Sequence, residues 1–265
     1  MDDTLLHSDL SISKRTRNAI KQAEEAGLTI VLASGRIPEA MDRYVRLLGL
    51  NTNPGYLISN NGAVIMESHT GKVIHEARID INTALTICDL AIAEDFPVQI
   101  YDDDIMYVSR KNEYSARDQK TTGIRQVEVR NFRAMLAEGC HKLVILGEPP
   151  VLSSLKVIIE NFMLNDATLF ISKPYFLELM PRGTDKGSAL AFVAKTLGVD
   201  ADQVMAIGDS MNDEAMIRWA GMGVAMANAD ARIKSIADLV TDSTNDQDGV
   251  AEVIEKYFFR KGSIA

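Results

Sequence analysis

An aspartate-rich segment follows a short apolar run late in the chain. In VMAIGDSMND (204–213) the apolar stretch ends at Gly208, and Asp209, Asn212 and Asp213 come next. Carboxylate oxygens suit a hard cation such as Mg²⁺, which takes a few carboxylates together with water and phosphate oxygens. Asn212 and Asp213 could instead cap the helix that follows. The segment predicts a cation site at Asp209 and leaves Asp213 open between cation ligand and helix cap.

Two other segments could hold an anion. Ser34-Gly35-Arg36 follows another apolar run, where a hydroxyl and backbone N–H groups can bind a phosphate, although a simple serine turn fits equally well. Lys186 falls in the first turn of an expected helix, where the helix dipole disfavours a cation. An anionic ligand at that point would reverse the penalty. The alternative for Lys186 is a solvated surface side chain.

The elements that must position these residues alternate between helix and strand at both ends of the chain. Residues 13–26 predict a surface helix that stops at Gly27, and residues 28–34 predict a strand buried on both faces. The alternation resumes at Gly187 and continues to a last helix at 248–258. The outer segments predict an α/β fold with a doubly wound, mostly parallel, Rossmann-like sheet. Ligands bind such sheets at the carboxyl ends of the strands.

The middle of the chain has a different order of elements. Between 81 and 183 the pattern reads helix, strand, strand, helix, strand, helix, strand, helix, strand, strand. We therefore expect an inserted α+β cap domain at 81–183 within a core domain made of residues 1–80 and 184–265. The hinges are expected near 79–83 and 181–185.

Composition excludes several classes of protein. Acidic residues outnumber basic ones by 37 to 28 in a chain of 265 residues, which argues against nonspecific nucleic-acid binding. The apolar runs are too short for a membrane span, and no signal peptide is visible. Cys88 and Cys140 can form neither a disulfide framework nor a four-ligand zinc site, so a cytoplasmic setting is expected. The oligomeric state is not determined by the sequence.

Taken together, these motifs resemble the haloacid dehalogenase-like (HAD) phosphatases, specifically the Cof-type subfamily with the large α/β (type IIB) cap. The family's first motif is Asp-x-Asp-x-Thr-Leu-Leu, and Met1–Leu6 matches it from the second position onward. Ala33–Arg36 matches the second motif, and Asp185–Gly187 matches the context of the family's lysine. Gly208–Asp213 matches the complete Gly-Asp-x-x-Asn-Asp motif, and the resemblance covers essentially the whole chain.

The resemblance implies a Mg²⁺-dependent phosphatase that hydrolyses small phosphorylated metabolites, usually sugar phosphates, through an aspartyl-phosphate intermediate. In this family pattern Asp2 acts as general acid and base, and its backbone carbonyl binds the metal. Asp209 supplies the second carboxylate of the metal site, and Asp213 orients the metal's surroundings or Lys186. The residues implied to hold the phosphoryl group are Met1, Ser34, Gly35, Lys186 and Asn212.

One part of the family pattern is missing. The nucleophilic Asp belongs immediately before Met1, and the strand that should carry it also lies outside the sequence. We interpret Met1 as an internal methionine of Asp-Met-Asp-Asp-Thr-Leu-Leu, so that the natural protein starts upstream and the chain as written is inactive. A nucleophilic Asp2 would put Thr-Leu-Leu two residues early. The alternatives are a non-catalytic phosphate-binding protein and a phosphomutase.

Overall fold

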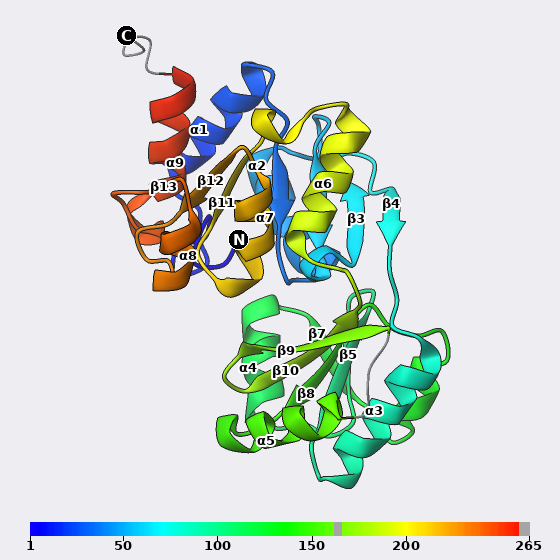
Figure 1. Cartoon of the computed structure of the whole chain (residues 1–265). Coiled ribbons are helices and arrows are strands. Elements are labelled where there is room, and N and C mark those ends of the chain that lie inside the picture. The colour runs from blue at the N-terminus through cyan, green and yellow to red at the C-terminus, as the bar shows by residue number, and fades with distance from the viewer. Residues whose placement is uncertain (162–165, 260–265) are drawn as a thin grey trace. The chain divides into compact units, whose positions relative to one another are not determined.

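The computed structural model describes residues 1–161 and 166–259. Parts of the expected domain ranges, 162–165 in the cap and 260–265 in the core, lie outside the described residues. The chain divides into two compact units (Figure 1), each of which is described by itself. Unit 1 comprises Met1–Gly35, Tyr44–Ile74 and Asp185–Ala265, and unit 2 comprises Arg36–Arg43 and His75–Thr184.

The first part of unit 1 contains a four-stranded sheet in the order β1-β2-β3-β4. Its strands are β1 (Val31–Ala33), β2 (Tyr56–Ser59), β3 (Val64–Glu67) and β4 (Val73–Glu76). The pairing of β1 with β2 is parallel, whereas β2 and β3 are antiparallel. We expected the first strand over residues 28–34, but its pairing with β2 covers only three residues.

The second part of unit 1 contains a three-stranded parallel sheet in the order β11-β12-β13. Its strands are β11 (Met205–Gly208), β12 (Met222–Ala225) and β13 (Leu239–Val240). Small residues permit close packing here, because a Cβ on Gly223 would lie 2.3 Å from the carbonyl oxygen of Ile217. The expected α/β fold with parallel strands and helices is confirmed, and in the described residues its strands form two sheets.

Helices accompany these strands along the chain. The helices are α1 (Lys14–Glu25), α2 (Pro38–Leu48), α6 (Lys186–Leu197), α7 (Glu214–Trp219), α8 (Ala231–Ile236) and α9 (Gly249–Ile254). The first and last helices, α1 and α9, pack side by side, and α6 packs against α7 (Figure 1). Ser13 caps α1 by accepting a hydrogen bond from the N–H of Thr16, as expected for a helix that begins near residue 13.

Unit 2 has the order of elements that the sequence predicts, with a 3₁₀ turn at Phe132–Leu136 in place of one helix. Its six-stranded sheet has the order β7-β6-β5-β8-β10-β9. The strands are β5 (Val98–Asp102), β6 (Ile105–Val108), β7 (Arg125–Glu128), β8 (Leu143–Leu146), β9 (Ala167–Lys173) and β10 (Phe176–Pro181). The helices are α3 (Ile81–Ala93), α4 (Glu113–Thr122) and α5 (Pro149–Glu160).

One large apolar cluster forms the core of unit 2. It joins α3 and α5 to the sheet through fully buried side chains such as Ile87, Ile100, Leu143 and Ile159. Both cysteines lie in this cluster as free thiols. In the part of the chain that the structure describes, no helix is long and apolar enough to cross a membrane.

Candidate active site

The first residues form a tight turn beside the carboxyl ends of β1 and β11. The carbonyl of Met1 accepts hydrogen bonds from the three N–H groups of residues 4–6, at 3.0 to 3.3 Å. The amino group of Met1 donates to the carbonyl of Ala33, the last residue of β1, at 3.3 Å. On the other side, Thr4 Oγ1 donates to Oδ1 of Asp209, which directly follows β11. The turn therefore links the ends of strands that belong to two different sheets.

A buried ion pair lies at the same strand ends. Nζ of Lys186 is 2.6 Å from Oδ1 of Asp213, and the two side chains are 3% and 2% exposed. The other carboxylate oxygen of Asp213 accepts the N–H groups of Asp209 and Ser210, at 3.0 and 3.2 Å. Asp213 makes no side-chain hydrogen bond that caps α7, so the helix-cap interpretation is wrong. Asp213 holds both Lys186 and the backbone that follows β11.

Burial and neighbouring charges both shift the pKa values of Asp213, Asp209 and the amino group of Met1. Burial alone would raise the pKa of Asp213, but Lys186, followed by the N-terminal amino group and hydrogen bonds, lowers it below its usual value. Burial lowers the pKa of the Met1 amino group, and the Lys186 ammonium lowers it further. Burial raises the pKa of Asp209 to about 6, with Asp213 adding to the rise and the Thr4 hydrogen bond opposing it.

Asp209 also lines a hollow of about 620 Å³ with a strongly acidic wall. Asp3, Asp230 and Asp246 line it as well, and the lining residues that the structure describes include no Lys or Arg. Oxygen donors and negative charge suit Mg²⁺, and a cation would offset the cost of burying the Asp209 carboxylate. The residues present therefore fit this metal.

The side chains of Asp2, Asp209 and Asp213, the three residues assigned to the metal from the sequence, do not form a cage of carboxylates. Across the described ranges, no group of three or more His, Cys, Asp or Glu side chains is placed to hold a metal ion. Asp213 is engaged by Lys186, and Asp2 is half-buried in the N-terminal turn. Mg²⁺ commonly takes one or two protein carboxylates and completes its shell with carbonyl, water and phosphate oxygens. Such a site needs Asp209 but not a third carboxylate.

The expected phosphate-binding residues are joined through a side chain that we did not single out. Nδ2 of Asn212 donates to Oδ1 of Asn61 at 3.0 Å. The same oxygen would lie 2.9 Å from a Cβ on Gly35, so the glycine makes room for it. The backbone N–H of Asn61 in turn donates to the carbonyl of Ser34 at 3.0 Å. Asn61 thus contacts Ser34, Gly35 and Asn212. The first two follow β1 and the third follows β11, strands of two different sheets.

Asn61 and Thr4 are the two site residues that sequence reasoning missed. Asn60-Asn61-Gly62 is a sequence typical of turns, and both asparagines have positive φ, at 47° and 52°. A turn at the end of a strand in this fold class is itself a signal, because ligands gather there. Thr4 matches the threonine of the family's first motif, a signal to which we assigned no role, and the folded chain brings it to Asp209.

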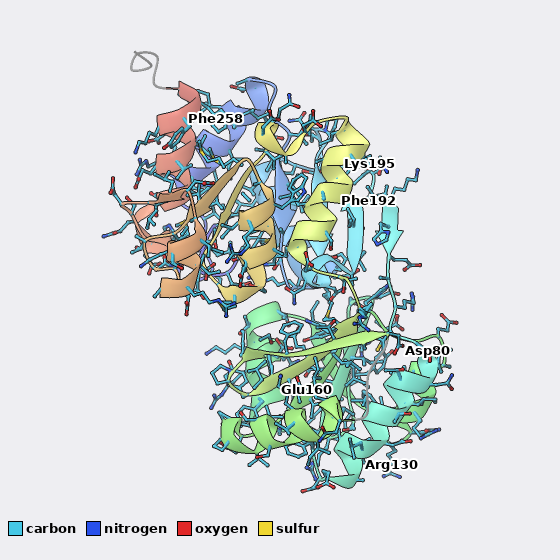
Figure 2. The ribbon with its side chains drawn as sticks, viewed as in Figure 1. Asp80, Arg130, Glu160, Phe192, Lys195 and Phe258 are labelled. Carbon is cyan, nitrogen blue, oxygen red and sulfur yellow. The ribbon has the colours of Figure 1, made fainter. Side chains whose placement is uncertain are left out.

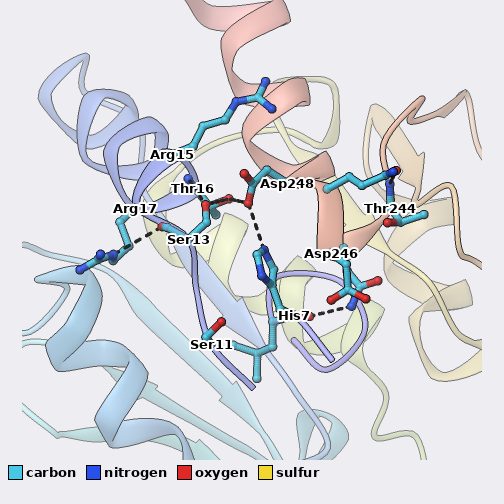
Figure 3. Close-up of polar contacts among 12 residues, drawn as sticks. His7, Ser11, Ser13, Arg15, Thr16, Arg17, Thr244, Asp246 and Asp248 are labelled. Carbon is cyan, nitrogen blue, oxygen red and sulfur yellow. Dashed lines mark hydrogen bonds and ion pairs between the residues drawn. The ribbon is translucent and has the colours of Figure 1, made fainter. Parts of the chain in front are cut away.

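The loop after the turn is tied to the start of the last helix (Figure 3). Nε2 of His7 lies 3.0 Å from Oδ1 of Asp248, and Thr16 Oγ1 donates to that same oxygen at 3.1 Å. Ser8 donates its backbone N–H and its hydroxyl to Asp246, both at 2.7 Å. These contacts anchor residues 7–16 to the C-terminal part of unit 1, which restricts how far Met1–Thr4 can move.

Comparisons with known proteins identify a family and similar folds. A family model described as haloacid dehalogenase-like hydrolase matches residues 1–254. A solved haloacid dehalogenase-like hydrolase from Bacteroides thetaiotaomicron is 31% identical, with a TM-score of 0.92 over 97% of each chain. The 5-amino-6-(5-phospho-D-ribitylamino)uracil phosphatase YcsE of Bacillus subtilis (strain 168) is 32% identical, over 97% of this chain and 93% of that protein.

A solved sugar phosphatase of HAD subclass IIB, BT4131, aligns with a TM-score of 0.80 over 97% of this chain and 96% of its own. At 21% identity this likeness concerns the fold alone. The order of elements inserts an α+β unit into an α/β unit. The chain belongs to the haloacid dehalogenase-like hydrolase family, in its Cof-type branch with the subclass IIB fold.

Proposed function

We propose that this protein is a Mg²⁺-dependent phosphatase of small phosphorylated metabolites. The observation that carries the proposal is the convergence of Met1, Asp209 and the Lys186–Asp213 pair at the carboxyl ends of two parallel strands. An ammonium held by a buried carboxylate, beside a second carboxylate and backbone N–H groups, suits a dianionic phosphoryl group and its metal.

The reaction requires a nucleophilic carboxylate, which the resemblance to the family puts immediately before Met1. An oxygen of that Asp attacks phosphorus, and the bond from phosphorus to the substrate's ester oxygen breaks. Asp2 donates a proton to the departing oxygen, which leaves as an alcohol. Asp2 then takes a proton from water, whose oxygen attacks the aspartyl-phosphate, and inorganic phosphate and the carboxylate are released. The chain that starts at Met1 lacks this nucleophile, so we expect it to bind phosphate without turnover.

The remaining site residues would position the phosphoryl group. Lys186 would neutralise part of its charge, with Asp213 holding the ammonium in place. Ser34, Gly35 and Asn212, gathered around Asn61, would donate hydrogen bonds to its oxygens. Mg²⁺ would be held by Asp209 and by the backbone carbonyl of Asp2. When bound, the metal offsets negative charge on the transferring group.

Sugar phosphates are the substrate class that we propose first. One relative is named for a substrate with a phosphorylated ribityl chain, which is chemically a polyol phosphate. We propose the cytoplasm as the setting, supported by two cysteines that are free and buried.

Phosphate release from a panel of sugar phosphates tests the proposal. We would compare the chain as written with a chain extended by an apolar strand that ends in Asp before Met1, each with Mg²⁺ and with EDTA. The proposal predicts release only from the extended protein with Mg²⁺. Equal release from both proteins would make Asp2 the nucleophile and contradict the assigned roles.

Phosphate binding without release from either protein would favour a non-catalytic binding protein. Transfer of the phosphoryl group between sugar positions, seen with a bisphosphate activator, would indicate a phosphomutase.

A further inference from the structure

Two asparagine side chains, from the loops that follow β12 and β13, hold the N-terminal turn by its backbone. Nδ2 of Asn228, in the loop after β12, donates to the carbonyl of Asp3 at 2.7 Å. Nδ2 of Asn245, in the loop after β13, donates to the carbonyl of Leu6 at 2.9 Å. Asn245 is buried, whereas Asn228 is exposed at the wall of the acidic hollow. Both loops are orange in Figure 2, where their side chains appear as sticks.

The two asparagines are also joined to each other. Oδ1 of Asn228 accepts the backbone N–H of Asn245 at 2.9 Å. A carbonyl only accepts and a backbone N–H only donates, so these partners fix which end of the Asn228 amide is nitrogen. An aspartate at either position would put a carboxylate oxygen against a carbonyl of the turn. The geometry therefore calls for an amide at both positions.

The turn that these amides hold contains a residue in the left-handed region. Asp3 has φ of 53°, a conformation that disfavours residues with a side chain. Before Asp3, the carbonyl of Met1 accepts the N–H groups of residues 4–6, and after it Asn228 fixes the Asp3 carbonyl. The peptide group between Asp2 and Asp3 is planar, so holding the chain on both sides sets the direction of the Asp2 carbonyl.

We propose that Asn228 and Asn245 are positioning residues, which hold the turn so that the backbone carbonyl and the side chain of Asp2 face the metal and the substrate. The inference rests on the proposed function, in which that carbonyl binds Mg²⁺ and that carboxyl moves the proton. Mg²⁺ demands near-ideal octahedral geometry, so a carbonyl ligand whose direction varies would bind it weakly. Each asparagine acts through the turn and not by touching the metal.

The sign of a change in Mg²⁺ affinity separates this role from an electrostatic one. Asn228 lines the hollow together with Asp209, Asp230 and Asp246. A carboxylate at position 228 adds negative charge to that wall, which by itself strengthens the attraction of a cation. Loss of the hydrogen bond to Asp3 has the opposite effect, because it releases the turn.

Two variants and one control, each made in the full chain, test the inference. Asn228→Asp and Asn245→Ala each remove one amide that donates to the turn. Thr244→Asp is the control, since Thr244 lines the same hollow and, among the described residues, has no hydrogen bond to residues 1–6. Amide hydrogen exchange is measured at residues 4–6, together with the urea midpoint and the Mg²⁺ affinity in calorimetric titration.

Asn228→Asp should speed exchange at residues 4–6 by about tenfold and lower the Mg²⁺ affinity by about tenfold. Its urea midpoint should stay nearly unchanged, because Asn228 is exposed. Asn245→Ala should have the same effects on exchange and affinity, with a lower midpoint because Asn245 is buried. Thr244→Asp should leave exchange unchanged and raise the affinity.

Unchanged exchange in both asparagine variants would overturn the inference. So would a Mg²⁺ affinity that rises in Asn228→Asp as it does in Thr244→Asp, because added charge would then explain the result. Faster exchange with an unchanged affinity would also overturn it, since the amides would then serve stability alone. The proposed function fails separately: a parent chain that binds no Mg²⁺ would refute its metal site, and the exchange rates would still decide whether the two amides hold the turn.

Discussion

The ammonium of Lys186 lies 2.6 Å from the carboxylate of Asp213, and both side chains are almost fully buried. This pair joins the first turn of α6 to the loop after β11. It explains a lysine at the positive end of a helix, where the dipole opposes it. A buried ion pair contributes little net stability, since desolvation offsets the attraction. Its position at the strand ends instead suits a cation kept in place for an anionic ligand.

Removing one partner of the Lys186–Asp213 pair should lower the free energy of unfolding. Lys186→Met leaves Asp213 buried without its partner, and we expect a loss of about 3–5 kcal/mol in the free energy of unfolding, measured by urea denaturation. The double variant Lys186→Met with Asp213→Leu should recover part of the loss, because no charge remains buried. A single variant as stable as the parent would contradict the assignment of a buried pair.

Asp209 should dominate metal binding. Asp209→Asn removes a ligand charge, and we expect Mg²⁺ affinity to fall by at least about tenfold in calorimetric titration. Asp246→Asn, which alters another carboxylate of the same hollow, should leave the affinity nearly unchanged. Because burial raises the pKa of Asp209 to about 6, protons should compete with the metal, so affinity should fall as pH drops below about 6. If both variants lose the same Mg²⁺ affinity, the cation is attracted by the summed negative charge of the hollow, and Asp209 is not its specific ligand.

Glu39, in the first turn of α2, should make stability depend on pH. Burial raises its pKa, and Asp102, Asp103 and Asp104 add to the rise. A carboxyl with a raised folded-state pKa stabilises the fold at pH values below its unfolded pKa, and this contribution is lost as pH rises through the folded pKa. Glu39→Gln should therefore gain stability over the parent as pH rises above the unfolded pKa of a glutamate, about 4.3. Glu25→Gln, at an exposed position, serves as the control. If the stability gained by Glu39→Gln does not grow with pH, the raised pKa of Glu39 is contradicted.

Gly62 should tolerate no side chain. It has φ of +106°, and a Cβ would lie 2.4 Å from the carbonyl oxygen of Asp185, the residue before Lys186. Gly62→Ala should cost about 3 kcal/mol or more of folding stability and weaken phosphate binding by displacing Lys186. Gly71 has φ of +70° with nothing within 4 Å of a Cβ, so Gly71→Ala should cost only about 1–2 kcal/mol. Thermal unfolding of both variants measures their loss of stability. Equal losses would contradict the close approach of Gly62 to the carbonyl of Asp185.

The cysteines should be inert in the folded protein. Burial raises the pKa of both the Cys88 and the Cys140 thiol to about 12, so neither carries reactive thiolate at neutral pH. We expect a thiol-specific reagent to label them only as fast as unit 2 opens, and at once in denaturant. Rapid labelling of the native chain would place at least one thiol outside the core.

Much of the fold could be predicted from local sequence. The alternation of apolar runs with helical patterns placed Asp209 after a strand and Lys186 in the first turn of a helix, and the structure confirms both positions. Asn61 and Thr4 could not be found in this way. Their hydrogen-bond partners lie 151 and 205 residues away, and no local pattern encodes such a contact.

The residue pattern by itself determined the identity of the elements and the chemistry they carry. The periodicity of apolar residues indicates which face of a helix or strand is buried. The spacing of the motifs indicates which polar residues follow a strand or begin a helix. Only the tertiary structure decided that Asp213 holds Lys186 and does not cap α7, and that Asn61 gathers the expected phosphate ligands. It alone revealed an apolar cavity of about 580 Å³ that residues of both β1 and β11 line. The physical reason is that strand pairing and buried ion pairs join segments far apart in the chain, so their geometry exists only after folding.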